Sequence, residues 1–129
     1  MSMNNLFLAI ASILAGLAVI GGAFASHSLK NILTDYALSI WETGIKYQMY
    51  HSLGLFLVAI LMKSQEISSI WLNTAGFAFI IGIILFSGSL YLLSFTEIKW
   101  LGAITPLGGV AFILGWGCLA FFAFSFNEK

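Results

Sequence analysis

Residues Ile67–Thr96 read ISSIWLNTAGFAFIIGIILFSGSLYLLSFT and contain no charged side chain. A helix needs about 20 consecutive, mostly apolar residues to cross the hydrocarbon core of a bilayer. This stretch is longer than that, so it predicts a tilted transmembrane helix. Two further uncharged stretches, Met1–Ser26 and Trp100–Asn127, predict two more transmembrane helices.

A fourth span is predicted where the uncharged stretch is shorter, at Tyr47–Met62. The preceding segment, Ser28–Ile45, carries apolar residues at spacings of three and four, with polar residues between them. We expect an amphipathic helix that lies along the membrane surface and ends at Gly44. The predicted fold is an all-α membrane protein of one domain, residues 1–129, with transmembrane helices at about 4–25, 46–63, 69–95 and 100–126 in a four-helix bundle and an interfacial amphipathic helix at about 28–44.

The composition supports this fold class. Of the 129 residues, 60% are apolar and 8% are charged, whereas a soluble domain usually has about 25% charged residues. The formal net charge is zero, so nucleic-acid binding is not expected.

Cys118, the only cysteine, lies in an apolar stretch and is interpreted as a packing residue. The residues Ala23–Ala25 resemble a signal-peptide cleavage site, but the segment before them lacks a basic start, so we expect it to be retained.

Small residues four positions apart favour close contact between helices in lipid. Such pairs indicate a tight bundle, a homo-oligomer or attachment to a larger membrane complex. They are Ser12 and Gly16, Ala18 and Gly22, Ala78 and Gly82, and Ala111 and Gly115.

The predicted spans contain no Asp, Glu, Lys or Arg. Ion-coupled transporters usually need an ionisable group inside the membrane, so the chain is a poor candidate for one. It also has no phosphate-binding loop, no nucleophile elbow and no HExxH motif. We therefore expect no enzymatic activity and no cofactor.

Two histidines occur near predicted span ends, His27 after the first span and His51 at the start of the second. Both are expected on the same membrane face. Facing imidazoles can bind haem iron or another metal, and they can equally form hydrogen bonds at the interface. The fold of the connecting segment decides whether they meet.

Polar and helix-shaping residues are expected to gather in the same half of the membrane. Proline removes a backbone hydrogen bond and glycine permits close approach of a neighbouring helix, so the freed backbone groups need polar partners. The predicted polar cluster consists of His27, Gln48, His51, Ser87, Ser89, Tyr91 and Thr105, and the predicted helix-shaping residues are Gly88, Pro106, Gly108 and Gly109. We favour a hydrogen-bonded brace between helices. The alternative is a shallow site for a lipid headgroup, a quinone ring or a partner's side chain.

Four motifs in this chain resemble those of a known family. They are GAFASHSLK at residues 22–30, YQMYHSL at 47–53, FSGSLY at 86–91, and TPLGG at 105–109 followed by Gly115–Trp116. The chain resembles the YgdD-like family of small bacterial membrane proteins, known as domain of unknown function 423 and related to transmembrane protein 256.

The resemblance covers nearly the whole chain and implies a multi-pass protein of the bacterial plasma (inner) membrane with four helices. It implies no activity. Ala25 replaces a glycine of the family motif, and Ser26 and Ser52 replace alanines. The matching motifs contain the residues of the predicted cluster.

Three functions are compatible with these observations. The first is an accessory, scaffold or complex-associated membrane subunit. The second is binding or passage of a neutral or lipid-like small molecule through the polar cluster. The third, less favoured, is a redox role in which His27 and His51 are axial haem ligands.

Overall fold

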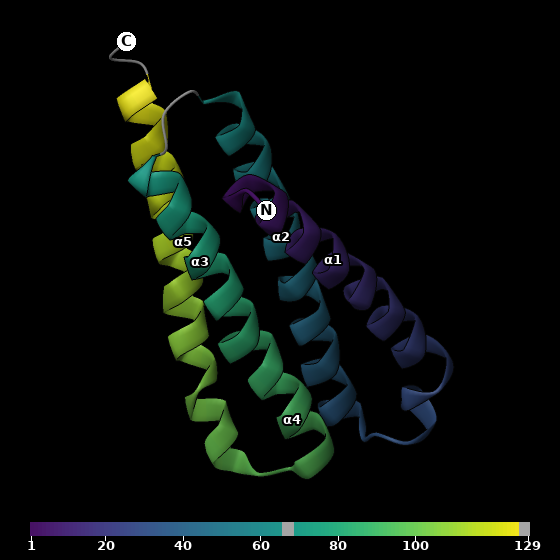
Figure 1. The fold of residues 1–129 in the computed structure, drawn as a ribbon. Coiled ribbons are helices and arrows are strands. Elements are labelled where there is room, and N and C mark those ends of the chain that lie inside the picture. Colours follow the sequence, from purple (N-terminus) through teal and green to yellow (C-terminus); the bar gives the residue numbers. More distant parts are fainter. Residues whose placement is uncertain (66–68, 127–129) are drawn as a thin grey trace.

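The computed structural model describes residues 1–65 and 69–126, and nearly all of them are helical. No strand occurs among these residues. The long helices are α1 (Met3–His27), α2 (Asp35–Ser64), α3 (Ile70–Gly82), α4 (Gly88–Thr96) and α5 (Thr105–Phe126). Shorter segments are the 3₁₀ turns η1 (Leu29–Asn31) and η3 (Lys99–Ala103) and the π-helical turn η2 (Ile83–Ser87) (Figure 1).

Four helical segments are long and apolar enough to cross a membrane. They are Met3–His27, Asp35–Ser64, Ile70–Thr96 and Lys99–Ser125. The third consists of α3, η2 and α4 in direct succession. The predicted class, an all-α membrane protein with four spans, is confirmed.

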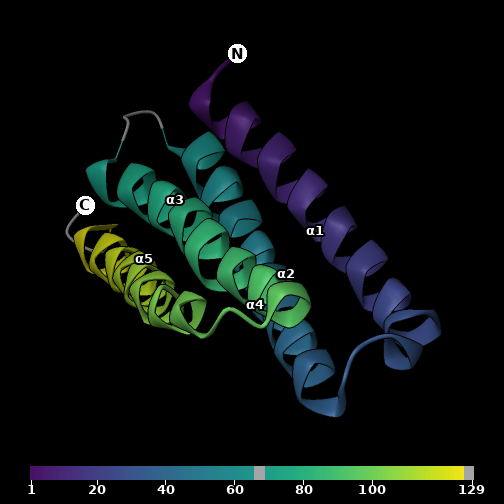
Figure 2. The same cartoon turned by 90° about the horizontal axis from the view of Figure 1, so that it is seen from below.

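The helices are arranged with α2 near the centre. α1 packs mainly against α2, and α3 packs mainly against α5, while α2 also contacts α3, η2 and α4. Figure 2 shows α1 and α5 on opposite sides of the molecule, with α2 and α3 between them. One consequence is that α1 has a close neighbour along one side only, and it is the least buried of the four candidate spans.

The apolar core joins all four spans. It includes Phe7 from α1, Leu55 from α2, Phe79 from α3 and Phe112 from α5, each almost fully buried. Phe7 lies over Gly76, where a Cβ atom would collide with the Phe7 ring. The large ring therefore needs a glycine opposite it, as expected for close helix packing in lipid.

The segment predicted as a separate interfacial helix is the first part of α2. Thr34 begins the helix, since its Oγ1 accepts a hydrogen bond from Ala37 N at 3.1 Å. The helix then continues through Gly44, which was predicted to end it. Gly44 has no positive φ, the conformation that such an ending needs. It is buried, and a Cβ atom there would lie 2.6 Å from Tyr91 Cε1, so close packing explains this glycine.

α2 therefore contains charged residues that were predicted to lie outside the spans. It has 30 residues, or about 45 Å, which exceeds a hydrocarbon core of about 30 Å. Its first turns carry the exposed side chains Asp35, Glu42 and Lys46. The uncharged stretch Tyr47–Met62 remains the part suited to the membrane interior.

Pro106 lies elsewhere in its helix than predicted. It was expected about a turn and a half inside the fourth span, where it would break the helix. The structure starts α5 at Thr105, so Pro106 is its second residue, and η3 forms the preceding turn. Proline is well tolerated in a first turn, because the backbone N–H groups there have no partner within the helix.

The irregularity of the third span is also shifted. Gly88 was expected to shape the helix, yet a Cβ atom there would meet nothing within 4 Å. The deviation is the π-helical turn η2, Ile83–Ser87, directly before it. Such turns insert one extra residue per turn and are common at functional or specially packed positions.

Candidate functional site

The predicted polar cluster is divided in the structure into three hydrogen-bonded groups and one isolated residue. The groups centre on Gln48, on Ser89 and on His51. His27 joins none of them. All three groups connect different helices.

Gln48 of α2 connects three helices. Its Nε2 donates to the backbone oxygen of Leu14 in α1 at 2.7 Å, and its Oε1 accepts from Tyr91 Oη of α4 at 2.7 Å. The side chain is 6% exposed, so both bonds are largely shielded from water. Buried amides need such partners, since an unpaired polar group in an apolar environment costs several kcal/mol, on the order of 2–7.

Ser87 adds a second link between α2 and the third span. Its Oγ donates to the backbone oxygen of Gly44 at 2.6 Å, and its side chain is fully buried. Ser87 is the last residue of η2, so the π-helical turn lies directly before this contact. The backbone oxygen of Gly44 thus gains a partner where the missing side chain lets α4 approach.

Trp41 belongs to the same region, although it is not among the residues of the predicted cluster. Its Nε1 donates to the backbone oxygen of Gly21 in α1 at 3.1 Å, and its ring lies 4.6 Å from the Tyr91 ring. Gly21 lets α2 approach α1 at this point, since a Cβ atom there would lie 2.5 Å from the Ile45 side chain and 3.6 Å from the Trp41 ring.

Ser89 and Thr105 connect α4 to the start of α5. Their hydroxyl oxygens lie 2.6 Å apart, and Ser89 Oγ donates to the backbone oxygen of Phe86 at 2.9 Å. A serine hydroxyl has a single proton, so the Thr105 hydroxyl is the donor between the two.

His51 has both ring nitrogens engaged. Nδ1 lies 2.8 Å from the backbone oxygen of Tyr47, and Nε2 accepts from Trp116 Nε1 at 3.0 Å. A carbonyl oxygen can only accept and an indole N–H can only donate, so the contacts fit a neutral imidazole with its proton on Nδ1. The ring stacks on Phe112 with centroids 3.5 Å apart. No lone pair is left over for a metal.

His27 and His51 are far apart. His27 is the exposed last residue of α1, whereas Gln48, less than one turn before His51, contacts Leu14. The rise from Leu14 to His27 along α1 is about 20 Å at 1.5 Å per residue. The structure therefore does not bring the two imidazoles together as axial ligands. Among the described residues, no three His, Cys, Asp or Glu side chains are grouped as a metal site would require.

Of the predicted helix-shaping residues, Gly108 alone lies at a close backbone approach. A Cβ atom at Gly108 would lie 2.8 Å from Phe86 Cα and would also collide with the Phe86 backbone nitrogen. A Cβ atom at Gly109 would meet nothing within 4 Å. Gly108 thus allows α5 to contact the π-helical turn.

Within the described part of the chain, every buried side-chain nitrogen and oxygen has a hydrogen-bond partner. The cluster thus contains no buried polar atom directed at an empty space. This arrangement favours the hydrogen-bonded brace over an internal binding site.

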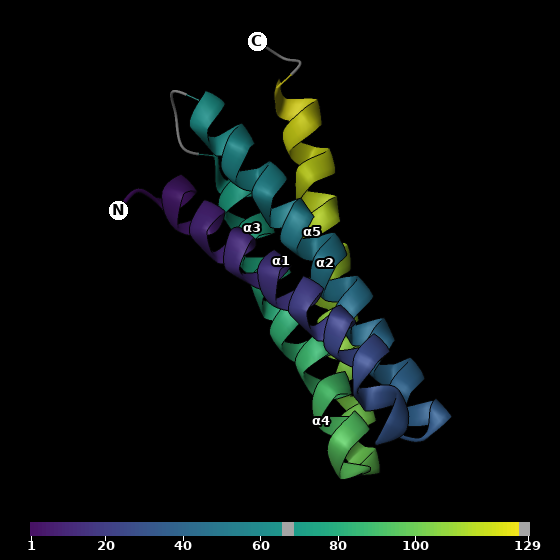
Figure 3. The same ribbon diagram turned by 90° about the vertical axis from the view of Figure 1, so that its right-hand side faces the viewer.

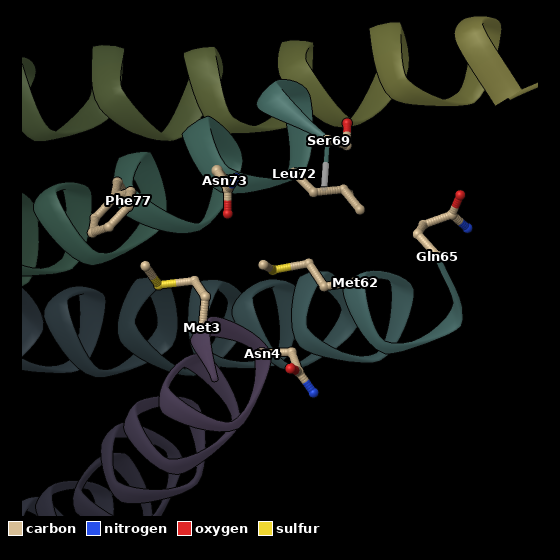
Figure 4. A pocket seen from close by; sticks show the side chains of 8 residues that line it. All are labelled: Met3, Asn4, Met62, Gln65, Ser69, Leu72, Asn73 and Phe77. Atoms are coloured by element: carbon tan, nitrogen blue, oxygen red, sulfur yellow. The ribbon is translucent and has the colours of Figure 1, made fainter. Parts of the chain in front are cut away.

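A cavity of about 530 Å³ lies at the other end of the molecule, beside the start of α1. Figure 4 shows its lining, with Asn4 from α1, Met62 from α2 and Phe77 from α3. The side chains drawn there are apolar or neutral polar. It is separate from the predicted cluster, none of whose residues line it.

The four small-residue pairs have different surroundings. A Cβ atom at Gly22, Gly82 or Gly115 would approach a side chain of another helix. Gly16 differs, since a Cβ atom there would meet nothing within 4 Å, and both Ser12 and Gly16 are exposed. One small-residue pair therefore faces outward on α1.

Comparison with known proteins identifies the family. A model described as protein of unknown function (DUF423) matches residues 21–109, which include α2, α3, α4 and the start of α5. The chain belongs to the DUF423 family.

Relatives of this DUF423 chain include the UPF0382 membrane protein YwdK of Bacillus subtilis, which is 54% identical over 113 residues, covering 87% of this chain and 90% of the relative. The UPF0382 membrane protein SH2409 of Staphylococcus haemolyticus is 41% identical over 122 residues, covering 95% and 98%. No solved structure matches the chain. The names of these DUF423 relatives agree with an integral membrane protein and give no activity.

Proposed function

We propose that this protein is a non-enzymatic accessory or scaffold subunit of the bacterial plasma (inner) membrane. The observation that carries the proposal is that the described buried polar side chains are all hydrogen-bonded within the protein. Gln48, Ser87 and Ser89 hold the helices in place, and this leaves the lipid-facing surface for interactions.

The outer face of α1 supports this proposal. The helix packs mainly against α2, and it exposes Ile13, Leu17 and Ile20 together with the outward pair Ser12 and Gly16. Small residues on a lipid-facing surface let a second helix approach closely. A membrane partner, or another copy of the chain, would bind here.

In-cell photo-crosslinking tests the proposal. A photoreactive phenylalanine analogue at Ile20, which is 65% exposed, is expected to form a discrete crosslinked species containing a membrane protein. The same analogue at Ile84, which is 64% exposed on the third span, serves as the matched control and is expected to give no such species. Equal crosslinking at both positions, or none at Ile20, would count against a partner on α1.

The alternative functions have less support. Binding or passage through the polar cluster would need polar groups free to contact a ligand, and the hydrogen bonds of Gln48 and Ser89 use those groups within the protein. A redox role would need His27 and His51 at one iron. An absorption spectrum of protein purified from haem-producing cells tests this role, and a Soret band would support it.

A further inference from the structure

A groove of about 560 Å³ runs between α2 and α5. In Figure 3 α5 lies partly behind α2, and the side chains of the two helices meet at the hydrogen bond from Trp116 Nε1 to His51 Nε2. The groove opens on the outside of the bundle, and two of its lining residues, His51 and Trp116, form one of the hydrogen-bonded groups. Its lining consists mainly of rings, and the residues are Tyr47, Tyr50, His51, Phe86, Gly109, Phe112, Ile113 and Trp116.

Two features make this groove suited to a hydrocarbon chain. Gly109 leaves space on α5, because a Cβ atom there would meet nothing within 4 Å. Phe86 and Phe112 lie 5.4 Å apart between ring centroids and form an apolar wall. A hydrocarbon chain in the groove would contact these rings in place of neighbouring lipid tails.

Trp116 closes one end of the groove. Its indole is held by the hydrogen bond to His51 Nε2 and by the Phe79 ring, 4.8 Å away. Gly54 provides room for it, since a Cβ atom there would lie 3.3 Å from the indole. A second groove, of about 570 Å³, begins on the other side of Trp116 and is lined by Leu57 and Ala120 among others.

The opposite end of the groove carries groups that bind anions. The phenols of Tyr47 and Tyr50 have no hydrogen-bond partner among the described residues, although their rings pack together at 5.7 Å. Lys46 is exposed one turn before Tyr50, and it forms no ion pair within the described part of the chain. One ammonium and two phenols thus lie where a long helix leaves the hydrocarbon core, the level at which tyrosine and lysine contact headgroups.

We propose that this groove binds one anionic phospholipid of the bilayer. The acyl chain lies against Phe112 and Ile113 and ends at Trp116. The headgroup phosphate is bound by the ammonium of Lys46 and the hydroxyls of Tyr47 and Tyr50. This inference does not depend on the proposed partner at α1, which lies on the opposite side of α2.

The test measures quenching of Trp116 fluorescence by brominated lipids. The protein carries Trp71→Phe and Trp100→Phe, and the contribution of Trp41 is subtracted with a matched protein that also carries Trp116→Phe. The protein is reconstituted in phosphatidylcholine vesicles in which a tenth of the lipid is brominated along the acyl chain. Two preparations are compared, one in which the brominated lipid is phosphatidylglycerol and one in which it is phosphatidylcholine. Brominated phosphatidylglycerol is expected to associate with the site about fivefold more, since one lysine near the surface favours anionic lipid by about that factor.

Three variants locate the lipid. Lys46→Gln is expected to abolish the preference for phosphatidylglycerol. Gly109→Leu is expected to reduce quenching, because the leucine fills the groove. Gly117→Leu is the matched control. A Cβ atom at Gly117 also meets nothing within 4 Å, but the residue does not line the groove, so quenching is expected to stay unchanged. Circular dichroism confirms that each variant is folded.

The proposal is overturned by equal quenching with the two brominated lipids in the parent protein. A preference that persists in Lys46→Gln overturns the headgroup contact. A reduction of equal size in Gly109→Leu and Gly117→Leu overturns the placement of the chain in the groove.

Discussion

Individual polar residues in this protein connect helices. Gln48 uses both ends of its amide, one on the backbone of α1 and the other on Tyr91 of α4. His51 likewise uses both ring nitrogens. Hydrogen bonds of this kind contribute about 0.6 kcal/mol on average in a membrane protein, so several of them together make a useful contribution to stability.

Replacing Tyr91 by Phe tests the Gln48 group. The variant keeps the ring packed on Trp41 but leaves Gln48 Oε1 without its donor, so we expect a loss of about 1 kcal/mol of unfolding free energy. Unfolding in mixed micelles, followed by circular dichroism, measures it. Tyr50→Phe is the control, because that phenol has no hydrogen-bond partner among the described residues. Equal stability of both variants would contradict the role given to Tyr91.

The sequence predicted which polar residues gather in one region, but it did not predict their hydrogen-bond partners. Gln48, Ser87 and Tyr91 were placed in one half of the membrane from their distance to the span ends, and the structure brings them together. Their partners include backbone oxygens of Leu14 and Gly44, which no side-chain pattern reveals. Such contacts depend on how each helix is rotated about its axis, and this is decided by packing.

His27 was placed wrongly relative to His51 for a related reason. The prediction that they share a membrane face assumed a helix lying flat between them. Because α2 begins at Asp35 and runs straight into the membrane, His51 lies more than four turns from its start.

At the scale of whole helices, glycine and proline have effects that depend on position. Gly44 lies inside α2 against Tyr91, and Pro106 lies in the first turn of α5. The sequence suggested a helix end at the first and a break at the second, since each residue type favours those features. The amphipathic pattern of Ser28–Ile45 was read correctly as helical, but periodicity cannot show whether two helical segments are continuous.

Adjacent glycines of α5 provide a matched comparison. Gly108→Ala would place a methyl group against the backbone of Phe86, so we expect it to destabilise the protein by about 1–3 kcal/mol through overpacking. Gly109→Ala has free space and is expected to be neutral or slightly stabilising, since alanine favours helix. Thermal unfolding of the two variants in the same detergent measures the difference. A Gly108→Ala protein as stable as Gly109→Ala would show that α5 does not approach η2 so closely.

Replacement of Pro106 tests where α5 begins. Pro106→Ala is expected to change the unfolding free energy by less than about 1 kcal/mol, because the second position of a helix has no backbone hydrogen bond to restore. Ile113→Pro, in the exposed middle of the helix, is expected to cost about 3 kcal/mol. Stabilisation by more than about 2 kcal/mol in Pro106→Ala would mean that the proline interrupts a longer helix.

At the scale of the whole molecule, the fold class followed from composition and from long uncharged stretches, because these reflect the thickness of the bilayer. These sequence features did not show which helices pack against each other. The central position of α2 and the outer position of α1 depend on which small residues meet which rings, such as Phe7 on Gly76. The outward pair on α1, Ser12 and Gly16, became recognisable only after the other pairs were found inside.

Purification of tagged protein from native membranes in mild detergent, followed by a native gel and mass spectrometry, tests the proposed function most directly. The account expects co-purification with a defined membrane complex or a homo-oligomer. Gly16→Leu, which has room for its side chain in the single chain, is expected to abolish this association without unfolding the protein. A protein that runs alone as a monomer, and whose deletion leaves the membrane complexes of the cell intact, would contradict the proposed function.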